Sequence, residues 1–232
     1  MKIYYLVILI LSVNSIVHAQ KTDTTYYLEF NAEGLKMSEE GYILNGHKLK
    51  KEFLLMGKFP AKYLVEILNN DESVIQKKEN DKWQTIDTIE QMFIEVDDSN
   101  RISIPNFRIE DFNKDGNQDI ICQTGTNVNG NDWVQIYLND PKTKSLIKLH
   151  NSAEDESDTW DAPEYNKKDS TIHCTHVSGN FGYSFESTYK LIRYQAIPIK
   201  KFERDNTKMT SSGKGSIKRY FIGNQGKWKL LE

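Results

Sequence analysis

The chain has 232 residues, with 30 Lys and Arg against 33 Asp and Glu and a formal net charge of −3. A charge so close to zero lacks the basic footprint of nucleic-acid binding, so the sequence predicts no nucleic-acid partner. Aromatic residues make up 11% of the chain. This content excludes an intrinsically disordered chain and predicts a protein with a sizeable hydrophobic core.

Residues 1–19 have the pattern of an export signal. Lys2 precedes an apolar stretch from Ile3 to Val17, and Val17-His18-Ala19 offers a cleavage point after Ala19. Polar residues interrupt the stretch, which is too short for a comfortable membrane span, and an uncleaved anchor is the alternative. We therefore predict a signal peptide at 1–19 and export to the periplasm or the extracellular space. No membrane span is expected after its removal.

Residues 20–100 are predicted to form a β-rich extension with one short helix. Tyr26–Phe30 and Gly41–Leu44 are β-like, and Asn45-Gly46 predicts a hairpin turn into the next run, His47–Leu55. Within 60–79, apolar residues recur at helical spacing and predict a helix of about ten residues. They are Ala61, Leu64, Val65 and Leu68.

From residue 101 to 232, short β-like runs alternate with turn residues. Examples are Gln118–Thr124, Trp133–Leu138 and Glu186–Ile199, and turns of the type Asn139-Asp140-Pro141 separate them. No repeat of about 20–50 residues is present, which argues against a propeller. The sequence thus predicts a mainly β fold: an antiparallel meander arranged as a sandwich or half-open barrel, with the second part as a calcium-loop β domain.

An alternation of oxygen-bearing residues predicts a calcium site. A hard cation takes about six to eight oxygen ligands, and a loop with ligands at positions 1, 3, 5 and 9 and a carbonyl at 7 supplies most of them. Gly116 occupies position 6, where the chain turns sharply, while Cys122 replaces the Glu of an EF-hand at position 12. The alternative is an Asp/Asn-rich turn that binds nothing. The predicted Ca²⁺ ligands are Asp111, Asn113, Asp115, Asn117 and Asp119.

Two cysteines, Cys122 and Cys174, remain after signal removal. In an oxidising exported compartment an even pair favours a disulfide, provided that the two β-like segments are neighbours. The alternative is two buried free thiols that behave as small hydrophobic side chains.

Other polar clusters predict no catalysis. The run 154–161 is rich in acids and would serve either as a solvated loop or as a surface that meets a basic enzyme. His173, Cys174 and His176 are too few, and on alternate faces of a strand, for structural zinc. No Gly-x-Ser-x-Gly or His-Glu-x-x-His motif occurs, so we expect a protein that is not an enzyme.

The order of segments from about 107 to 204 resembles a family of exported calcium-loop β proteins. This family includes periplasmic immunity proteins that guard against peptidoglycan-cleaving effectors of bacterial secretion systems, and it is similar in architecture to periplasmic lysozyme inhibitors. The matching segments are Ile109–Asn113, Asp115-Gly116, Asp119-Ile120, the small-residue loop 125–131, Trp133–Tyr137, Leu146–Leu149, Pro163–Tyr165, Lys168–Ile172, Ser178-Gly179, Tyr183 and Tyr189.

The resemblance implies a partner-binding loop. In these inhibitors Ser-Gly followed shortly by Tyr enters the hydrolase cleft, and Ser178, Gly179 and Tyr183 match, with three residues between Gly and Tyr in place of the usual two. It thus implies an inhibitor or immunity protein whose protein partner is a peptidoglycan hydrolase. One alternative is a calcium-stabilised adhesion or glycan-binding module in which Trp133 and Tyr137 stack on sugars; another is a hydrolase with an unrecognised acid pair.

Overall fold

The computed structural model describes residues 26–28, 35–38, 41–44, 50–68, 72–90, 95–96, 102–103, 107–126, 131–153, 156–178, 182–206, 209–210, 213–214, 217–224 and 226–231. Across these ranges every regular element is a strand and none is a helix. The mainly β prediction is confirmed. The predicted signal peptide and the Asn45-Gly46 turn lie outside the described residues.

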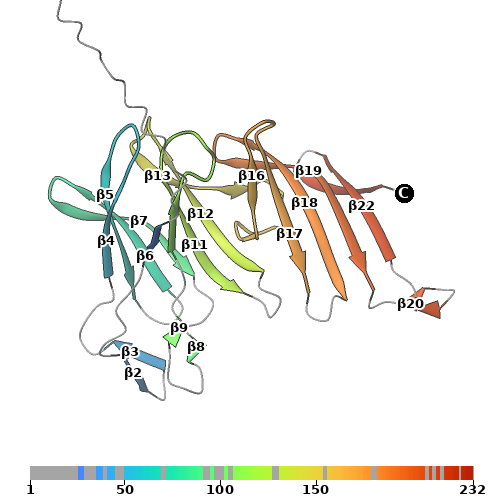
Figure 1. Cartoon of the computed structure of the whole chain (residues 1–232), viewed down its shortest axis with the longest axis horizontal. Coiled ribbons are helices and arrows are strands. Elements are labelled where there is room, and N and C mark those ends of the chain that lie inside the picture. Colours follow the sequence, from blue (N-terminus) through green and yellow to red (C-terminus); the bar gives the residue numbers. More distant parts are fainter. Residues whose placement is uncertain are drawn as a thin grey trace, which may run out of the picture.

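Three main sheets build the molecule, and Figure 1 shows them from left to right. The first is a four-stranded antiparallel meander of β4 (Lys50–Leu55), β5 (Ala61–Ile67), β6 (Glu72–Glu79) and β7 (Lys82–Glu90). The second has the order β1 (Tyr26–Leu28), β10 (Phe107–Glu110), β11 (Asp119–Thr126), β12 (Asp132–Asp140) and β13 (Ser145–Lys148), with β15 (Trp160–Asp161) paired to β12.

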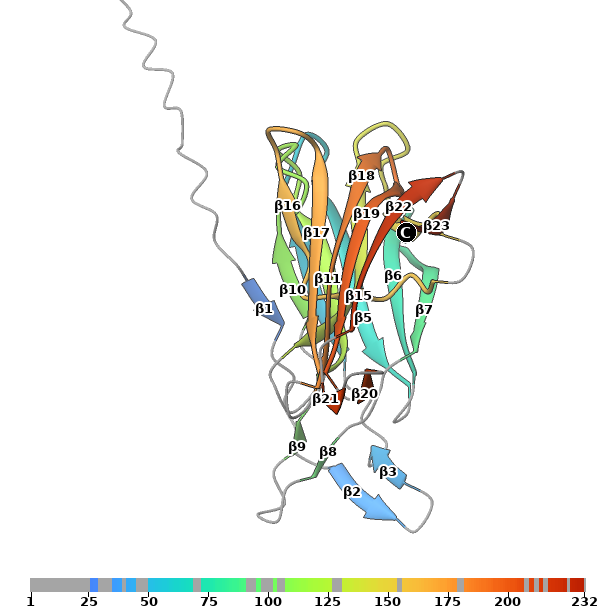
Figure 2. The ribbon, with the colours of Figure 1, turned by 90° about the vertical axis from the view of Figure 1, so that its right-hand side faces the viewer.

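The third sheet is the widest. Its order is β16 (Glu164–Asn166), β17 (Thr171–Val177), β18 (Tyr183–Ile192), β19 (Gln195–Asp205), β22 (Ile217–Asn224) and β23 (Lys227–Leu231), and β14 (His150–Asn151) pairs with β19 in parallel. Three isolated two-stranded pairs complete the set: β2 (Leu35–Ser38) with β3 (Gly41–Leu44), β8 (Glu95–Val96) with β9 (Ile102–Ser103), and β20 (Met209–Thr210) with β21 (Gly213–Lys214). These pairs lie at the lower end of the molecule (Figure 2).

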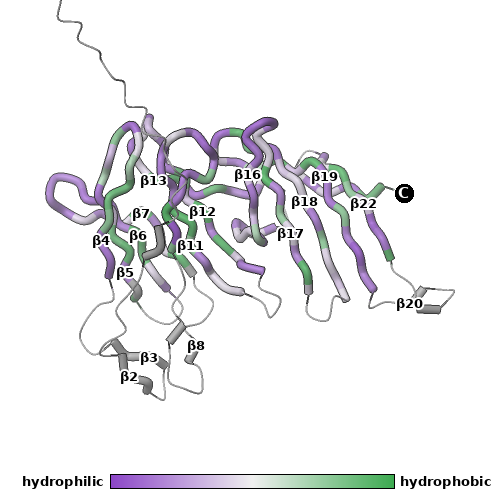
Figure 3. Tube along the Cα trace, in the orientation of Figure 1, coloured by the Kyte–Doolittle hydropathy of each residue, from purple (hydrophilic) through white to green (hydrophobic). Residues whose placement is uncertain are grey.

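The second sheet is the middle layer, because the two faces of its strands belong to different cores. On β11, Ile120 packs with the first sheet, whereas Ile121 packs with the third. The first core also contains Tyr63 and Ile75 of the first sheet, so residues before and after position 100 share one core. Figure 3 shows apolar stretches along β11 and β12, as expected for strands buried on both faces.

The predicted helix within 60–79 is wrong, because β5 and β6 occupy that segment. Tyr63 and Val65 point into the first core and are fully buried, while Leu64 and Glu66 on the opposite face are also buried. When both faces of a strand are buried, apolar residues follow no strict alternation, and the spacing of a helix arises by chance. The hairpin partners also differ from those predicted: β3 pairs with β2, and β4 pairs with β5.

Candidate functional site

The segment between β10 and β11 closes into a tight loop. The carboxylate of Asp111 accepts the backbone N–H groups of Asp115 and Gly116, both at 3.0 Å. Asn113 Oδ1 accepts the same Asp115 N–H at 3.1 Å. Lys114 and Gly116 adopt positive φ angles of 55° and 96°, which turn the chain back on itself. The segment predicted from sequence as a calcium loop is therefore closed by hydrogen bonds from its backbone N–H groups to the side-chain oxygens of Asp111 and Asn113.

Asp119 anchors the end of this loop in the interior and is fully buried. Its two oxygens accept the backbone N–H of Phe112 at 3.0 Å and that of Asn139 at 2.8 Å. Burial raises the pKa of the Asp119 carboxyl well above its usual range, although the amide of Asn139 opposes this. The negative charges of Asp115 and Asp111 raise that pKa further. The three carboxylates are thus electrostatically coupled.

The chemistry of the donors suits a hard cation, because all the candidate groups are oxygens. A carboxylate oxygen that accepts one amide hydrogen keeps a second lone pair for a metal. Within the described ranges, however, no three His, Cys, Asp or Glu side chains are already gathered as a metal cluster. A cation would therefore draw on the Asn113 amide oxygen and a backbone carbonyl besides the carboxylates.

Asn117 joins the loop to the first sheet. Its side chain is almost fully buried, and Oδ1 accepts the backbone N–H of Lys58 at 2.9 Å. Gln118 and Met56 exchange two further hydrogen bonds, each 2.8 Å long. A Cβ on Gly57 would lie 2.5 Å from Asn117 Oδ1, so the two loops meet in direct contact. Sequence reasoning missed this contact, since nothing in residues 56–58 marks them as a partner of the loop from Asp111 to Asp119.

The β17–β18 hairpin brings two of the three predicted partner-binding residues together. Ser178 N–H donates to the carbonyl of Tyr183 at 2.8 Å, and Tyr183 N–H donates to Ser178 Oγ at 2.8 Å. Gly179 lies outside the described residues. The hairpin below is regular, with pairs running from Thr171↔Lys190 to Val177↔Ser184.

Tyr183 lies on the face of the sheet and is half-buried. Its ring centroid is 6.4 Å from that of His176 and 6.3 Å from that of Phe185. Burial, with the negative charge and the hydrogen bond of Glu203, raises the pKa of the Tyr183 phenol to about 12. The phenol is therefore protonated at neutral pH and engaged with Glu203.

Of the two alternatives left open for the cysteines, the structure shows the pair of buried free thiols and no disulfide. Cys122 and Cys174 are free, buried thiols on opposite sides of the middle sheet. Cys122 faces the first sheet, whereas Cys174 on β17 faces the other side of β11 and β12, so the sheet itself separates them. Burial raises the pKa of both thiols, which keeps them in the unreactive protonated form.

The acidic run is anchored to the sheet through Glu156, while positions 154 and 155 lie outside the described residues. Its carboxylate accepts hydrogen bonds from the Tyr189 hydroxyl at 2.6 Å, the Trp228 indole at 2.6 Å and the Asn151 amide at 2.9 Å, and Lys201 Nζ lies 3.4 Å away. The interpretation of this run as a solvated loop is therefore wrong at Glu156. Only the tertiary structure reveals the network, since its members are far apart in sequence.

The two aromatic residues proposed for sugar stacking are not presented to solvent as a pair. Tyr137 is only 1% exposed, and its hydroxyl donates to Asp87 at 2.8 Å. Trp133 is half-buried, and its indole N–H donates to Asp161 at 2.6 Å. Tyr137 therefore belongs to the core.

No protein-family model matches this chain, and no curated protein sequence matches it either. Among solved structures, the chain is similar to one described as "Structure of a Xanthomonas Type IV Secretion System related protein". The similarity covers 91% of this chain and 95% of that chain, with 15% sequence identity and a TM-score of 0.44. At these values it carries no argument about function. Among the described residues, no helix is long and apolar enough to cross a membrane.

Proposed function

We propose that this protein is an exported, calcium-stabilised inhibitor or immunity protein that acts on a lysozyme-like peptidoglycan hydrolase. The hairpin between β17 and β18 is the contact element in this proposal. The observation that supports it is the reciprocal pair of 2.8 Å hydrogen bonds between Ser178 and Tyr183, which holds both residues at the end of a regular hairpin.

The chemistry of these residues suits the cleft of a glycoside hydrolase. Such enzymes act through two carboxyl groups about 5–9.5 Å apart, and a protonated phenol can donate a hydrogen bond to a carboxylate. Tyr183 has a pKa of about 12 and therefore keeps its proton. In a complex it would exchange Glu203 for a carboxylate of the enzyme. Tyr also supplies contact area at a low cost in conformational entropy.

We also propose that Asp111, Asn113, Asp115 and Asp119 bind Ca²⁺, together with the backbone carbonyl of Asn117. A divalent cation would offset the mutual repulsion of three carboxylates, one of which is fully buried. Its role would be structural: it would fix the start of β11 and, through the contact between Asn117 and Lys58, the turn between β4 and β5.

The test is inhibition of several lysozyme classes by the purified mature protein. Tyr183→Phe removes the phenol without removing the ring, and we expect it to weaken inhibition about tenfold or more. Tyr220→Phe is the matched control, because Tyr220 lies on the same sheet and is 54% exposed. Absence of inhibition in every class, or equal effects of the two substitutions, would contradict the proposal.

A further inference from the structure

The two faces of the third sheet carry different residues along β19, β22 and β23. The inner face packs on the middle sheet, since its Cys174 and Tyr189 share a core with Ile121 and Val134. We call the opposite side the outer face; the third sheet is the last of the row in Figure 1. The strand register places the outer-face residues in three rows: Lys200↔Ile222↔Lys229, Phe202↔Tyr220↔Leu231 and Arg204↔Lys218.

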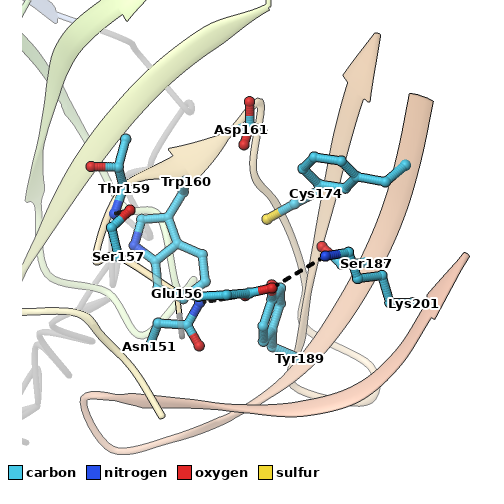
Figure 4. Close-up of a pocket in the computed structure, with 11 residues that line it drawn as sticks. Asn151, Glu156, Ser157, Thr159, Trp160, Asp161, Cys174, Ser187, Tyr189 and Lys201 are labelled. Carbon is cyan, nitrogen blue, oxygen red and sulfur yellow. Dashed lines mark hydrogen bonds and ion pairs between the residues drawn. The ribbon is translucent and has the colours of Figure 1, made fainter. Parts of the chain in front are cut away.

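The cations of the inner face are paired inside the protein. Lys201 Nζ lies 3.4 Å from Glu156 Oε1 (Figure 4) and 3.3 Å from Glu203 Oε1. Arg219 Nη1 lies 3.6 Å from Glu203 Oε2. Each positive charge on this face of β19 and β22 therefore has a carboxylate beside it.

The outer face of the same strands has an excess of positive charge. Four exposed cations belong to its rows: Lys200, Arg204, Lys218 and Lys229. Among the described residues, the register adds one acid to these rows, Glu186 opposite Phe202. Four positive charges beside one negative charge attract an anionic partner.

Apolar and aromatic side chains lie exposed between these cations. Tyr220 is 54% exposed, Ile222 40% and Leu231 45%. Phe202 lies beside Tyr220, with ring centroids 4.8 Å apart. These side chains are neighbours, because hydrogen-bonded strands lie about 4.8 Å apart. Single exposed apolar residues are ordinary, whereas a contiguous patch marks an interaction surface.

The cations flank the row Phe202↔Tyr220↔Leu231 on both sides. Residues two positions apart on a strand share a face and lie about 7 Å from each other, so Lys200 and Lys229 border one side of the row at that distance. Arg204 and Lys218 border the other side in the same way. Long basic side chains can keep their charge in water while their stems follow an apolar surface.

From these observations we propose that the outer face docks on a membrane surface that contains anionic lipids. The cations contact the lipid phosphates, and Tyr220, Ile222 and Leu231 enter the boundary between headgroups and acyl chains. Apolar side chains among basic ones are typical of peripheral membrane contacts. The inference goes beyond the proposed inhibition, because Tyr183 lies on the inner face beside Glu203.

Two features favour a lipid surface over other anionic partners. Three of the four cations are lysines, and protein–protein interfaces are depleted in Lys and enriched in Arg. A soluble anionic polymer would pair with the cations but would leave Ile222 and Leu231 in water. A lipid surface neutralises the charges and also removes the apolar side chains from water.

Co-sedimentation of the purified mature protein with vesicles tests this surface. The vesicles consist of phosphatidylcholine alone, or of phosphatidylcholine with about one-third phosphatidylglycerol as the anionic lipid. We expect binding to the anionic vesicles to be at least about tenfold tighter, and to weaken as salt is raised. Lys218→Gln and Lys229→Gln should each weaken it about fivefold, which corresponds to about 1 kcal/mol per lysine. Ile222→Thr should weaken it about three- to tenfold, because apolar contact is lost.

The matched controls lie on the first sheet. Lys62→Gln makes the same change in charge at an exposed position of β5. Leu54→Thr removes an apolar side chain of β4 that is 48% exposed. Both substitutions should leave vesicle binding unchanged.

Equal binding to both kinds of vesicle, or equal effects of Lys62→Gln and Lys229→Gln, would overturn the inference. Tighter binding of soluble polyglutamate than of anionic vesicles would also overturn it, and would assign the outer face to an acidic protein or polymer. Tyr183→Phe should leave vesicle binding unchanged. The outcome of this experiment and that of the inhibition test are therefore independent.

Discussion

The carboxylate of Glu156 accepts the indole N–H of Trp228 at 2.6 Å, although 72 residues separate them. This bond links the acidic segment after β14 to β23, the last strand of the third sheet. The same carboxylate binds Tyr189 of β18 and Lys201 of β19. One side chain therefore joins three strands to the segment that crosses them.

Replacing Glu156 with Gln should destabilise the protein. The single amide oxygen of Gln can accept only some of the hydrogen bonds that Asn151, Tyr189 and Trp228 donate to the Glu156 carboxylate. Lys201 also loses one of its two carboxylate partners. We expect a loss of about 2–3 kcal/mol in the free energy of unfolding, measured by urea denaturation. Glu164→Gln on β16 makes the same chemical change at an exposed position and should cost about 0.5 kcal/mol or less. Equal costs for both would contradict this role of Glu156.

The contribution of Glu156 should also depend on pH. Burial acts to raise its pKa, but the hydrogen bond from Tyr189 and the charge of Lys201 outweigh burial and lower the pKa below its usual 4.5. A pKa that is lower in the folded state gives stability that is present above pH 4.5 and is lost as pH falls through the lowered value. The difference in stability between wild type and Glu156→Gln should therefore be constant near neutral pH and shrink in acid. A difference that grows in acid would refute the assignment.

Calcium should stabilise the protein against heat. At a Ca²⁺ concentration about 100-fold above Kd, binding adds about 2.7 kcal/mol, or about 5–10 °C in Tm for a chain of this size. Proton release should accompany binding, since the raised pKa of Asp119 falls when a cation is near. Differential scanning fluorimetry with Ca²⁺ or excess chelator measures the shift. Asp115→Asn should reduce the Ca²⁺-dependent shift in Tm, whereas Asp81→Asn, at an exposed turn, should leave that shift unchanged. A Tm that is the same with Ca²⁺ and with excess chelator would rule the calcium site out.

Gly57→Ala should loosen the contact between the loop from Asp111 to Asp119 and the first sheet. The new Cβ would meet Asn117 Oδ1 at 2.5 Å, and relieving such an overlap costs about 1–3 kcal/mol. Because the nearest atom belongs to a side chain, the cost should be smaller in an Asn117→Ala background. A double-mutant cycle by chemical denaturation measures the coupling. If the changes in the free energy of unfolding for Gly57→Ala and Asn117→Ala were strictly additive, the two loops would not be in steric contact.

The two cysteines should stay reduced and inaccessible. We expect Cys122 and Cys174 to resist a thiol reagent in the native protein and to react fully after unfolding without reductant. Mass spectrometry of the alkylated protein distinguishes this outcome from a disulfide, in which neither residue reacts until reductant is added.

Local chemistry was readable from the sequence. The turn from Asp111 to Asp119 closes through hydrogen bonds between near neighbours, so the Asp, Asn and Gly residues were sufficient to predict a sharp turn there. The calcium site at this turn stays a prediction. Turn residues and short apolar runs likewise predicted strands in the second and third sheets. The helix predicted within 60–79 was wrong because β5 is buried on both faces, and a local window cannot distinguish that pattern from one face of a helix.

The sequence by itself determined that this chain forms β-strands and a sharp turn between Asp111 and Asp119, because those features depend on residues a few positions apart. Only the tertiary structure decided that Cys122 and Cys174 lie on opposite sides of one sheet, that Asn117 meets the turn at Gly57, and that Glu156 sits among aromatic donors. These relationships depend on which sheet faces pack together. That choice is made by burial across the whole molecule, where each contact joins residues distant in the chain.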